Sequence, residues 1–226
     1  MKNAFKVLGI AAFVAAVGFL FASCDSNGDS STGGSGSKEV LATVNSYDSN
    51  GNLTAYTEHE YGSNRRLTKT STYGADGVLY GYSVYEYGSN GRIKKISSYS
   101  ANGVLSFYQV NDEYDANGHE KKISNYGADG VLNSYNVYEY DANGRSAKDS
   151  NYSANGVLNY YNVYKYDTNG STVKCSISTY NANGVLMFSD SDYNVYEYDA
   201  NGRITKFSYY RGGVLTGYAT YIYKSL

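Results

Sequence analysis

The segment Val131-Leu-Asn-Ser-Tyr-Asn-Val-Tyr-Glu-Tyr140-Asp-Ala-Asn-Gly144-Arg145 combines a strand-like pattern with a tight turn. Valine and tyrosine are both favoured in β-strands. The residues after Tyr140 suit a three-residue loop, a type I turn in which Gly144 takes the left-handed conformation and forms a bulge. Such a loop pairs Tyr140 with Ser146, so the segment predicts two antiparallel strands joined as a hairpin.

The same pattern recurs along the chain from residue 39 onward. Most steps from one turn tyrosine to the next alternate between 14 and 12 residues, which gives a period near 26 with two turns in each period. The turn tyrosines are Tyr47, Tyr61, Tyr73, Tyr87, Tyr99, Tyr114, Tyr126, Tyr140, Tyr152, Tyr166, Tyr180, Tyr198 and Tyr210. No segment has a convincing helical period, so we predict an all-β fold: a repetitive antiparallel β-meander of about 14 strands between Glu39 and Tyr223. Because strongly twisted open sheets rarely exceed ~10 strands, we expect curling or closure, with a long single layer as the alternative.

The turn chemistry also predicts a register and two faces. The expected pairs are Tyr73 with Leu79, Tyr99 with Leu105, Tyr126 with Leu132, Tyr152 with Leu158, Tyr180 with Leu186 and, across a Gly-Gly loop, Tyr210 with Leu215. Strict alternation of side chains then assigns residues to the two faces. One face carries Leu79, Tyr85, Tyr87, Ile93 and Tyr99. The other face carries Val78, Tyr80, Tyr82, Val84 and Ile96. Strict alternation also places Glu86 opposite Lys94. One extra residue in the strand 104–114 predicts a bulge near Asn111-Asp112-Glu113.

The composition agrees with a sheet in which almost every backbone N–H is used. The 226 residues include 29 Tyr and 25 Gly but no Pro and no Trp. Tyrosine favours strands, glycine supplies turns, and proline would remove ladder hydrogen bonds.

The first residues are typical of an export signal. Lys2 and Lys6 precede an apolar run of 15 residues, from Val7 to Phe21, which is shorter than the ~20 needed to span a membrane as a helix. The run ends in Phe21-Ala22-Ser23-Cys24, which resembles the lipobox of bacterial lipoproteins. That resemblance implies that Cys24 is diacylated through its sulfur and becomes the mature N-terminus. An ordinary secretory signal, or a disulfide between Cys24 and Cys175, is the alternative.

The prediction for the whole chain is therefore a signal peptide over 1–23, a flexible Gly/Ser tether over 24–38 and a hairpin-repeat domain over 39–226. It places the protein outside the cytoplasm, anchored to a membrane by its lipid, at the cell surface or in the periplasm. Removal of 1–23 leaves 17 basic against 21 acidic residues, and this balance gives no basic footprint for nucleic acid.

The turn Tyr198-Asp199-Ala-Asn-Gly202-Arg203-Ile204 resembles the YD repeat (RHS-type) of bacterial surface and toxin proteins, and the turn that starts at Tyr140 matches it nearly as well. The resemblance covers 39–223 at low stringency, since several turns lose the Asp or the Arg. It implies hairpins joined into a wide, spiralling sheet. Large members of that family form shells around a toxin, and seven hairpins are too few for that. A weaker similarity is to hairpin repeats that bind cell-wall glycans, but those usually rely on Trp.

No pattern in the sequence points to an enzyme, a cofactor or a metal. His59 and His119 are the only histidines, and neither lies in a recognisable catalytic motif. Cys175 stands where related strands carry Val or Ile and is predicted to be a small apolar filler. The Asp-x-Asn-Gly turns at 48–51, 115–118, 141–144, 167–170 and 199–202 lack the recurring bidentate acid of a calcium loop. The periodic acids Glu86, Glu139 and Glu197 favour cross-strand ion pairs over a carboxylate pair for glycoside hydrolysis.

The tyrosines are the remaining candidates for function. Tyrosine offers a large rigid surface with a polar tip, which can stack on sugars or anchor protein contacts. The candidate binding face consists of Tyr80, Tyr82, Tyr108, Tyr135, Tyr161 and Tyr218. We therefore predict a module that binds glycan or protein through this face. The alternative is a structural spacer of the envelope without a discrete ligand.

Overall fold

The computed structural model describes residues 39–170, 172–188 and 192–226. The predicted signal peptide, Cys24 and the tether lie outside the described residues. The described part is all-β, as predicted, and forms one antiparallel sheet of fifteen strands. The strands are β1 (Glu39–Asp48), β2 (Leu53–Tyr61), β3 (Leu67–Gly74), β4 (Leu79–Tyr87), β5 (Ile93–Ser100), β6 (Leu105–Tyr114), β7 (Glu120–Gly127), β8 (Leu132–Tyr140), β9 (Ser146–Ser153), β10 (Leu158–Asn169), β11 (Thr172–Asn181), β12 (Leu186–Phe188), β13 (Tyr193–Tyr198), β14 (Ile204–Arg211) and β15 (Val214–Ser225). Among these residues there is no helix long and apolar enough to cross a membrane.

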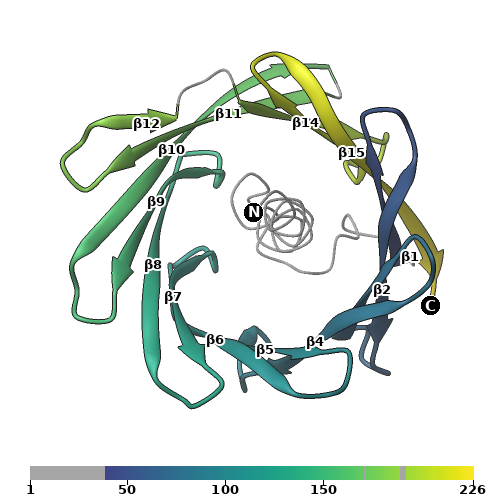
Figure 1. The fold of residues 1–226 in the computed structure, drawn as a ribbon, viewed down its shortest axis with the longest axis horizontal. Helices are drawn as coiled ribbons and strands as arrows, with labels where there is room; N and C mark the ends of the chain where they lie inside the picture. Colours follow the sequence, from purple (N-terminus) through teal and green to yellow (C-terminus); the bar gives the residue numbers. More distant parts are fainter. Residues whose placement is uncertain (1–38, 171, 189–191) are drawn as a thin grey trace, which may run out of the picture.

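The sheet closes on itself into a barrel (Figure 1). Consecutive strands pair as a meander, β10 pairs with β11, and the first strand pairs with the last, from Glu39 opposite Ser225 to Asp48 opposite Gly217. Fourteen strands make the closed ring, while β12 pairs only with the end of β11 and lies at the periphery. Closure satisfies the edges that an open sheet of this length would expose. It also replaces the wide spiral that the YD-type resemblance implied.

The strand count differs from the prediction at one place. The chain between Tyr180 and Tyr198 was expected to form one strand and instead forms two, β12 and β13. The 18-residue step between these two tyrosines is the longest in the chain. This segment is longer than a single strand paired with β11 requires. It divides into β13, which pairs with residues 172–176 of β11, and β12, which pairs with Thr179 and Tyr180.

The predicted register at the turns is confirmed. Tyr73 lies opposite Leu79, Tyr140 opposite Ser146 and Tyr210 opposite Leu215. The glycines of these turns have positive φ, 79° at Gly77 and 77° at Gly144, which only glycine adopts without strain. The bulge predicted near Asn111-Asp112-Glu113 is also present, because the pairing of β6 with β7 shifts between Asn111 and Glu113.

The predicted assignment of residues to the two faces of the sheet is wrong beyond the first residue after each turn. A bulge follows every three-residue loop, so that Tyr87 lies opposite Ile93 while Glu86 lies opposite Lys95, which leaves Lys94 as the extra residue. Each bulge inverts the alternation once. Tyr99 therefore lies opposite Tyr82, on the face from which it was excluded, and Ile96 lies opposite Tyr85. The loop residues predict the bulge correctly. The predicted faces are wrong because they assume that side chains alternate without interruption through the bulge.

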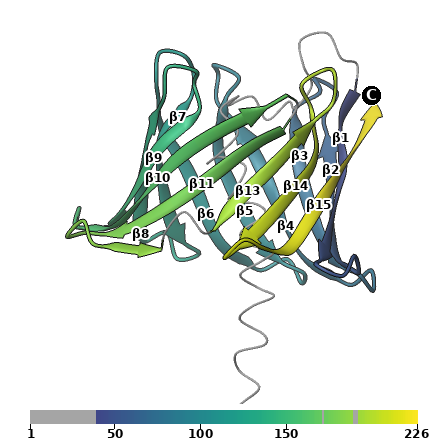
Figure 2. The ribbon, with the colours of Figure 1, turned by 90° about the horizontal axis from the view of Figure 1, so that it is seen from above.

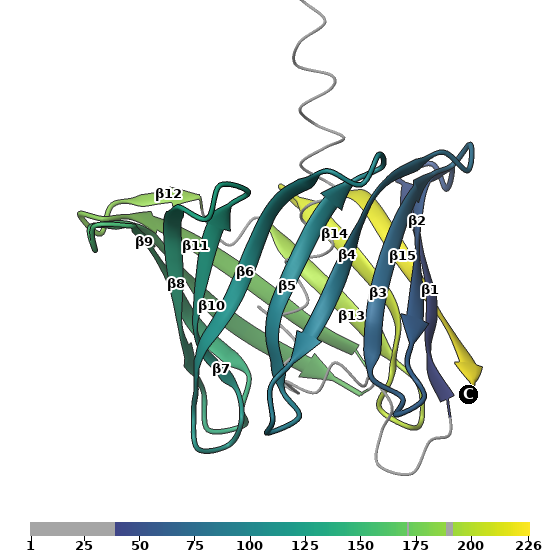
Figure 3. The ribbon, with the colours of Figure 1, turned by 90° about the horizontal axis from the view of Figure 1, so that it is seen from below.

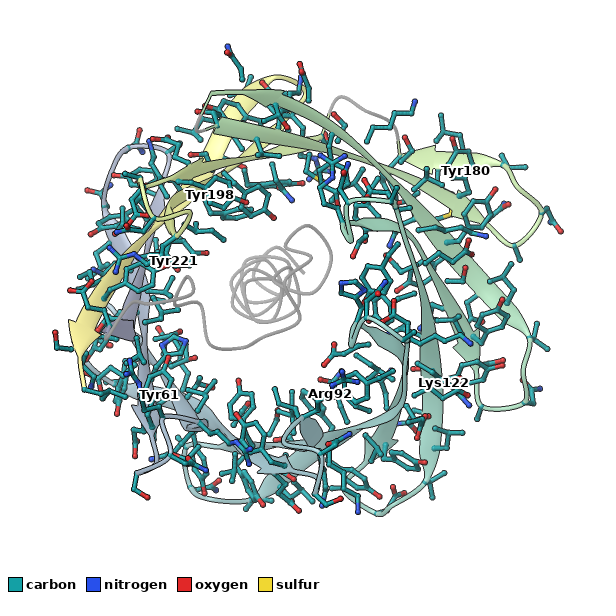
Figure 4. The ribbon with its side chains drawn as sticks, turned by 180° about the vertical axis from the view of Figure 1, so that it is seen from behind. Tyr61, Arg92, Lys122, Tyr180, Tyr198 and Tyr221 are labelled. Carbon is teal, nitrogen blue, oxygen red and sulfur yellow. The ribbon has the colours of Figure 1, made fainter. Side chains whose placement is uncertain are left out.

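The inner face of the barrel is built in layers (Figure 4). Tyr61, Arg92, Tyr198 and Tyr221 point into the ring, whereas Lys122 and Tyr180 lie on its outside. One inner layer consists of the cross-strand pairs His59–Thr70, Tyr85–Ile96, Asn111–Ile123, Tyr138–Asp149, Tyr164–Ile177, Tyr196–Phe207 and Tyr221–Val44. The apolar core gathers on one side of the ring and consists of Leu41, Val44, Tyr164, Cys175, Tyr196, Ile204, Phe207, Ala219 and Tyr221. Cys175 is fully buried there, which agrees with its predicted role as a small apolar filler.

The barrel has two rims with different residues (Figures 2 and 3). The terminal rim holds Glu39, the C-terminus and the turns that follow β2, β4, β6 and β8. The opposite rim holds the turns that follow β1, β3, β5, β7, β9, β11 and β14. In Figure 3 the C-terminus lies at the lower rim and β12 at the upper one.

Candidate functional site

Five of the six predicted binding tyrosines lie in one row around the outside of the barrel. Each stacks on a turn tyrosine of the neighbouring strand, as Tyr135 does on Tyr152 with ring centroids 5.0 Å apart. The seven stacked pairs, with centroids 4.8–5.0 Å apart, are Tyr47–Tyr218, Tyr56–Tyr73, Tyr82–Tyr99, Tyr108–Tyr126, Tyr135–Tyr152, Tyr161–Tyr180 and Tyr193–Tyr210. Offset stacking of this kind stabilises a sheet by roughly 0.5–1.5 kcal/mol per pair beyond the buried area.

In six of the seven pairs a lysine covers the second face of the tyrosine that stacks on the turn tyrosine. Lys122 of β7 lies 4.8 Å from the ring centroid of Tyr135 on β8, on the side away from Tyr152 of β9. Six rings are covered in this way, by Lys69, Lys95, Lys122, Lys148, Lys174 and Lys206. A sugar would need a free ring face for stacking, and these tyrosines offer mainly their edges and hydroxyl groups.

Tyr80 does not belong to this row. It is the bulge residue between Leu79 and Gly81, so it has no cross-strand partner in the register of β3. Its hydroxyl lies against the backbone of Gly74, where an added Cβ would come within 2.3 Å. Five of the predicted binding tyrosines therefore form one row, whereas Tyr80 lies against the turn that precedes its own strand.

The outer face also carries charged residues that pair across the strands. The predicted cross-strand ion pairs are present, with Lys148 Nζ 3.3 Å from Glu139 and Lys206 Nζ 3.5 Å from Glu197. Glu86 pairs with Lys95 at 3.6 Å rather than with Lys94, because of the bulge. Exposed ion pairs of this kind contribute little stability, at most ~1 kcal/mol each. They make the outer face water-compatible.

The Asp and Arg of the YD-like turns form a latch at the terminal rim. Asp199 Oδ1 accepts hydrogen bonds from the backbone N–H groups of Asn201 and Arg203, and its Oδ2 accepts one from Arg203 Nε at 2.7 Å. The bonds from the Arg203 backbone and guanidinium hold the pKa of Asp199 below its ordinary value. The guanidinium carbon then lies 4.7 Å from the ring centroid of Tyr223, whose hydroxyl donates to the carbonyl of Ile204 at 2.9 Å.

This latch recurs from hairpin to hairpin. Tyr87 and Tyr166 donate to the carbonyls of Leu67 and Ser146 at 2.9 and 2.8 Å, and their rings lie under Arg66 and Arg145. In the one turn where His119 replaces the arginine, its ring stacks on Tyr140 with centroids 4.6 Å apart. The tyrosine contacts therefore join neighbouring hairpins. Asp48, Asp115, Asp141 and Asp199 accept hydrogen bonds within their own turns, whereas Asp167 lies opposite Lys174 in the pairing of β10 with β11.

One sector of the inner wall, from β6 to β10, is unusually polar. It carries a layer of amide side chains joined across the strands: Gln109 donates to Asn125 at 2.8 Å, and Asn151 donates to Asn136 at 2.7 Å. The equivalent pairs in earlier hairpins are the smaller Thr57–Thr72 and Ser83–Ser98. Amides offer both donors and acceptors at the end of a longer side chain, which suits recognition of hydroxyl-rich ligands.

Two acids lie beside this amide layer on the inner face. Asp149, which is 8% exposed, accepts hydrogen bonds from the Tyr164 hydroxyl and from Asn162. Glu120 accepts one from Asn111. Burial raises the pKa of both carboxyl groups. Burial and the charges of Asp149 and then Glu120 raise the pKa of Tyr138, so the tyrosine lies near both acids.

Neither acid is among the predicted site residues, although the repeat distinguishes both. The residue after the turn cation is Leu67, Ile93 or Ile204 in three hairpins and the small Ser146 in a fourth, and Glu120 stands at this position in β7. The residue three before the turn tyrosine is Ile96, Ile123, Ile177 or Phe207 in four hairpins and Thr70 in another, and Asp149 stands at this position in β9. An acid at a position that otherwise carries an apolar residue or a small hydroxyl residue is a departure that packing alone does not require. It could have been found by aligning the hairpins with one another.

No family model matches the chain. No curated protein matches it either. Solved structures with a similar arrangement include a porin-like protein from Bacteroides uniformis, at 13% identity, covering 81% of this chain and 98% of that chain with a TM-score of 0.43. They also include a "putative lipoprotein" from Parabacteroides distasonis, at 14% identity, covering 81% of this chain and 94% of that chain with a TM-score of 0.31. A "putative exported protein" from Bacteroides fragilis, at 14% identity, covers 83% of this chain and 95% of that chain with a TM-score of 0.32. At these scores none of them identifies the function of the chain or shows that its turns are YD repeats.

Proposed function

We propose that the protein is a lipid-anchored component of the bacterial cell envelope whose barrel binds a glycan through the polar sector of its inner wall. The observation that carries the proposal is the placement of Glu120 and Asp149 beside a layer of four amides, at positions where the other hairpins carry an apolar residue, serine or threonine. Carboxylates and amides are the groups that bind sugar hydroxyls, and the nearby half-buried Tyr138 supplies aromatic surface. The outer tyrosine row, with its ring faces covered, is assigned to stability.

The test is a glycan array of bacterial and host oligosaccharides probed with the full-length protein. We expect saturable binding to at least one class of glycan. The double variant Glu120→Gln, Asp149→Asn keeps the shape of both side chains but removes their charges and replaces one acceptor oxygen of each by a donor NH2 group. Because hydrogen bonds to charged groups contribute about 1.5–3 kcal/mol each, we expect its affinity to fall roughly ten- to a hundredfold.

Tyr135→Ala is the matched control for this experiment. It breaks one outer stacked pair and should lower the urea midpoint of unfolding while leaving glycan affinity unchanged. If Tyr135→Ala loses glycan affinity and the double variant keeps it, the glycan binds to the outer tyrosine row and not to the inner wall. No binding across the array would favour the second candidate, a structural spacer, for which the covered outer rings are the supporting observation.

The lipid anchor is a separate part of the proposal and rests on the lipobox-like end of the signal segment at Cys24. Metabolic labelling with an alkyne fatty acid should label the full-length protein, and the label should be lost in Cys24→Ser and kept in Cys175→Ser. The chain has only these two cysteines, so a lipid on Cys24 and a disulfide from Cys24 to Cys175 exclude each other. An unlabelled protein in which reduction releases both thiols would overturn the anchor.

A further inference from the structure

Six valines form an exposed ring at the rim opposite the termini. Each directly follows the positive-φ glycine of its turn, and their exposed fractions lie between 57% and 67%. They are Val78, Val104, Val131, Val157, Val185 and Val214, and we call this end of the barrel the valine rim. A single exposed valine needs no explanation, but six at one repeated position form a pattern.

The turns themselves do not require valine. The residue at this position contributes its backbone carbonyl, as Val131 does when it accepts from Gly127 N–H at 2.9 Å. In the seventh turn of the same rim Asn52 stands in this place, is exposed, and accepts in the same way from Asp48 N–H at 3.0 Å. A polar residue is therefore compatible with the fold, and the side chains of the six valines have another role.

The surroundings of the valines are apolar and nearly uncharged. An exposed alanine precedes most of these turn tips, at Ala75, Ala101, Ala128, Ala154 and Ala182. The neighbouring tip residues are Asn102, Asn155 and Asn183 in three turns, with Asp76, Asp129 and Arg211 in the others. Leu186, Met187 and Phe188 of β12 are 48–55% exposed at the same rim and extend the apolar surface. The terminal rim differs, since it carries the Asp–Arg latches.

We propose that the valine rim is a contact surface for a second copy of this chain, placed rim to rim about a two-fold axis perpendicular to the barrel axis. Such an axis brings the same patch of each copy together. A repeated, nearly neutral apolar ring is complementary to itself, because its valines meet valines and little charge is opposed. With ~100 Å² exposed at each apolar side chain, each copy would bury on the order of 800 Å², the size of an ordinary specific interface.

The position of the termini gives this contact a direction. Glu39 lies at the terminal rim, so a lipid at the end of the preceding flexible segment would leave the valine rim free to face away from its own membrane. Two copies joined by their valine rims would then connect facing membranes. This orientation rests on the proposed anchor, whereas the contact between copies does not. Many copies on each surface would multiply a weak individual affinity.

The test reconstitutes the full-length protein into phosphatidylcholine vesicles and follows their clustering by light scattering. Sedimentation of the protein in detergent gives the dimer constant independently of the anchor. The variant Val104→Asn, Val131→Asn, Val157→Asn introduces the residue found at Asn52. We expect self-association at least tenfold weaker and loss of clustering, while the control Ile222→Asn, at an exposed apolar residue of β15 toward the other rim, behaves as wild type.

Each other outcome overturns the proposal. A triple variant that self-associates as wild type, with matching urea midpoints, places the contact elsewhere. A wild-type protein that is monomeric and does not cluster vesicles removes it. If protein-bearing vesicles cluster equally well with a large excess of protein-free vesicles, the rim binds lipid rather than a second copy. The result of the glycan-binding experiment is independent of these three outcomes.

Discussion

Replacement of Phe207 by Ala is expected to lower the free energy of unfolding by about 3–5 kcal/mol, the cost of removing a buried phenylalanine without full collapse of its site. Phe207 is 6% exposed, and its ring centroid lies 5.2 Å from that of Tyr196. Its cluster includes Val44 of β1 and Ala219 of β15, so it packs across the pairing of the first strand with the last. Equilibrium unfolding in urea, followed by circular dichroism, measures the loss.

Phe107→Ala is the matched control for Phe207. It removes the same side chain at a site that is 36% exposed, on β6, and should cost about 1 kcal/mol. Because domains are stable by only ~5–15 kcal/mol, the first variant should lose a large fraction of its stability and the second a small one. Equal losses would show that the cluster around Phe207 does not hold the barrel closed.

Acidification is expected to destabilise the protein through His59. Burial lowers the pKa of this imidazole to about 4, and among the described residues its Nδ1 atom has no hydrogen-bond partner. The folded state therefore favours the neutral ring, whereas the unfolded chain takes up a proton below about 6.5. The stability that His59 contributes is complete above pH 6.5 and is lost as the pH falls toward 4. A difference of about 2.5 pKa units corresponds to about 3 kcal/mol.

The measurement is the unfolding free energy at pH 7 and at pH 4 for the wild type and for His59→Asn, which introduces the residue found at the equivalent position Asn111. The raised pKa values of Glu120 and Asp149 act in the opposite direction, because protonation of these acids favours the folded state. Both acids are present in both proteins, so their effect cancels in the comparison. If the variant loses as much stability as the wild type between the two pH values, His59 is not the source.

The candidate site could be predicted from the sequence only in part. Tyr82, Tyr108, Tyr135, Tyr161 and Tyr218 were correctly placed in one row, because they occupy one position of the repeat. The faces of these rings are covered by lysines of a neighbouring strand. The turn residues do not specify which side chains lie side by side there, so this contact was not predicted. Glu120 and Asp149 belong to the same inner sector only because Tyr138 of β8 lies between their strands.

The sequence by itself determined the all-β class, the hairpin repeat and the register at the turns, because each turn is encoded within a few residues. A glycine with positive φ at Gly144 and an aspartate that accepts the N–H groups of its own turn act locally. Only the tertiary structure decided which face became the interior, because a bulge beside nearly every turn, the one between β10 and β11 excepted, inverts the alternation by one residue. It also decided that β1 meets β15, since closure depends on the summed twist of all the strands and on the packing of Phe207 and Tyr196. No short segment of the chain contains that information.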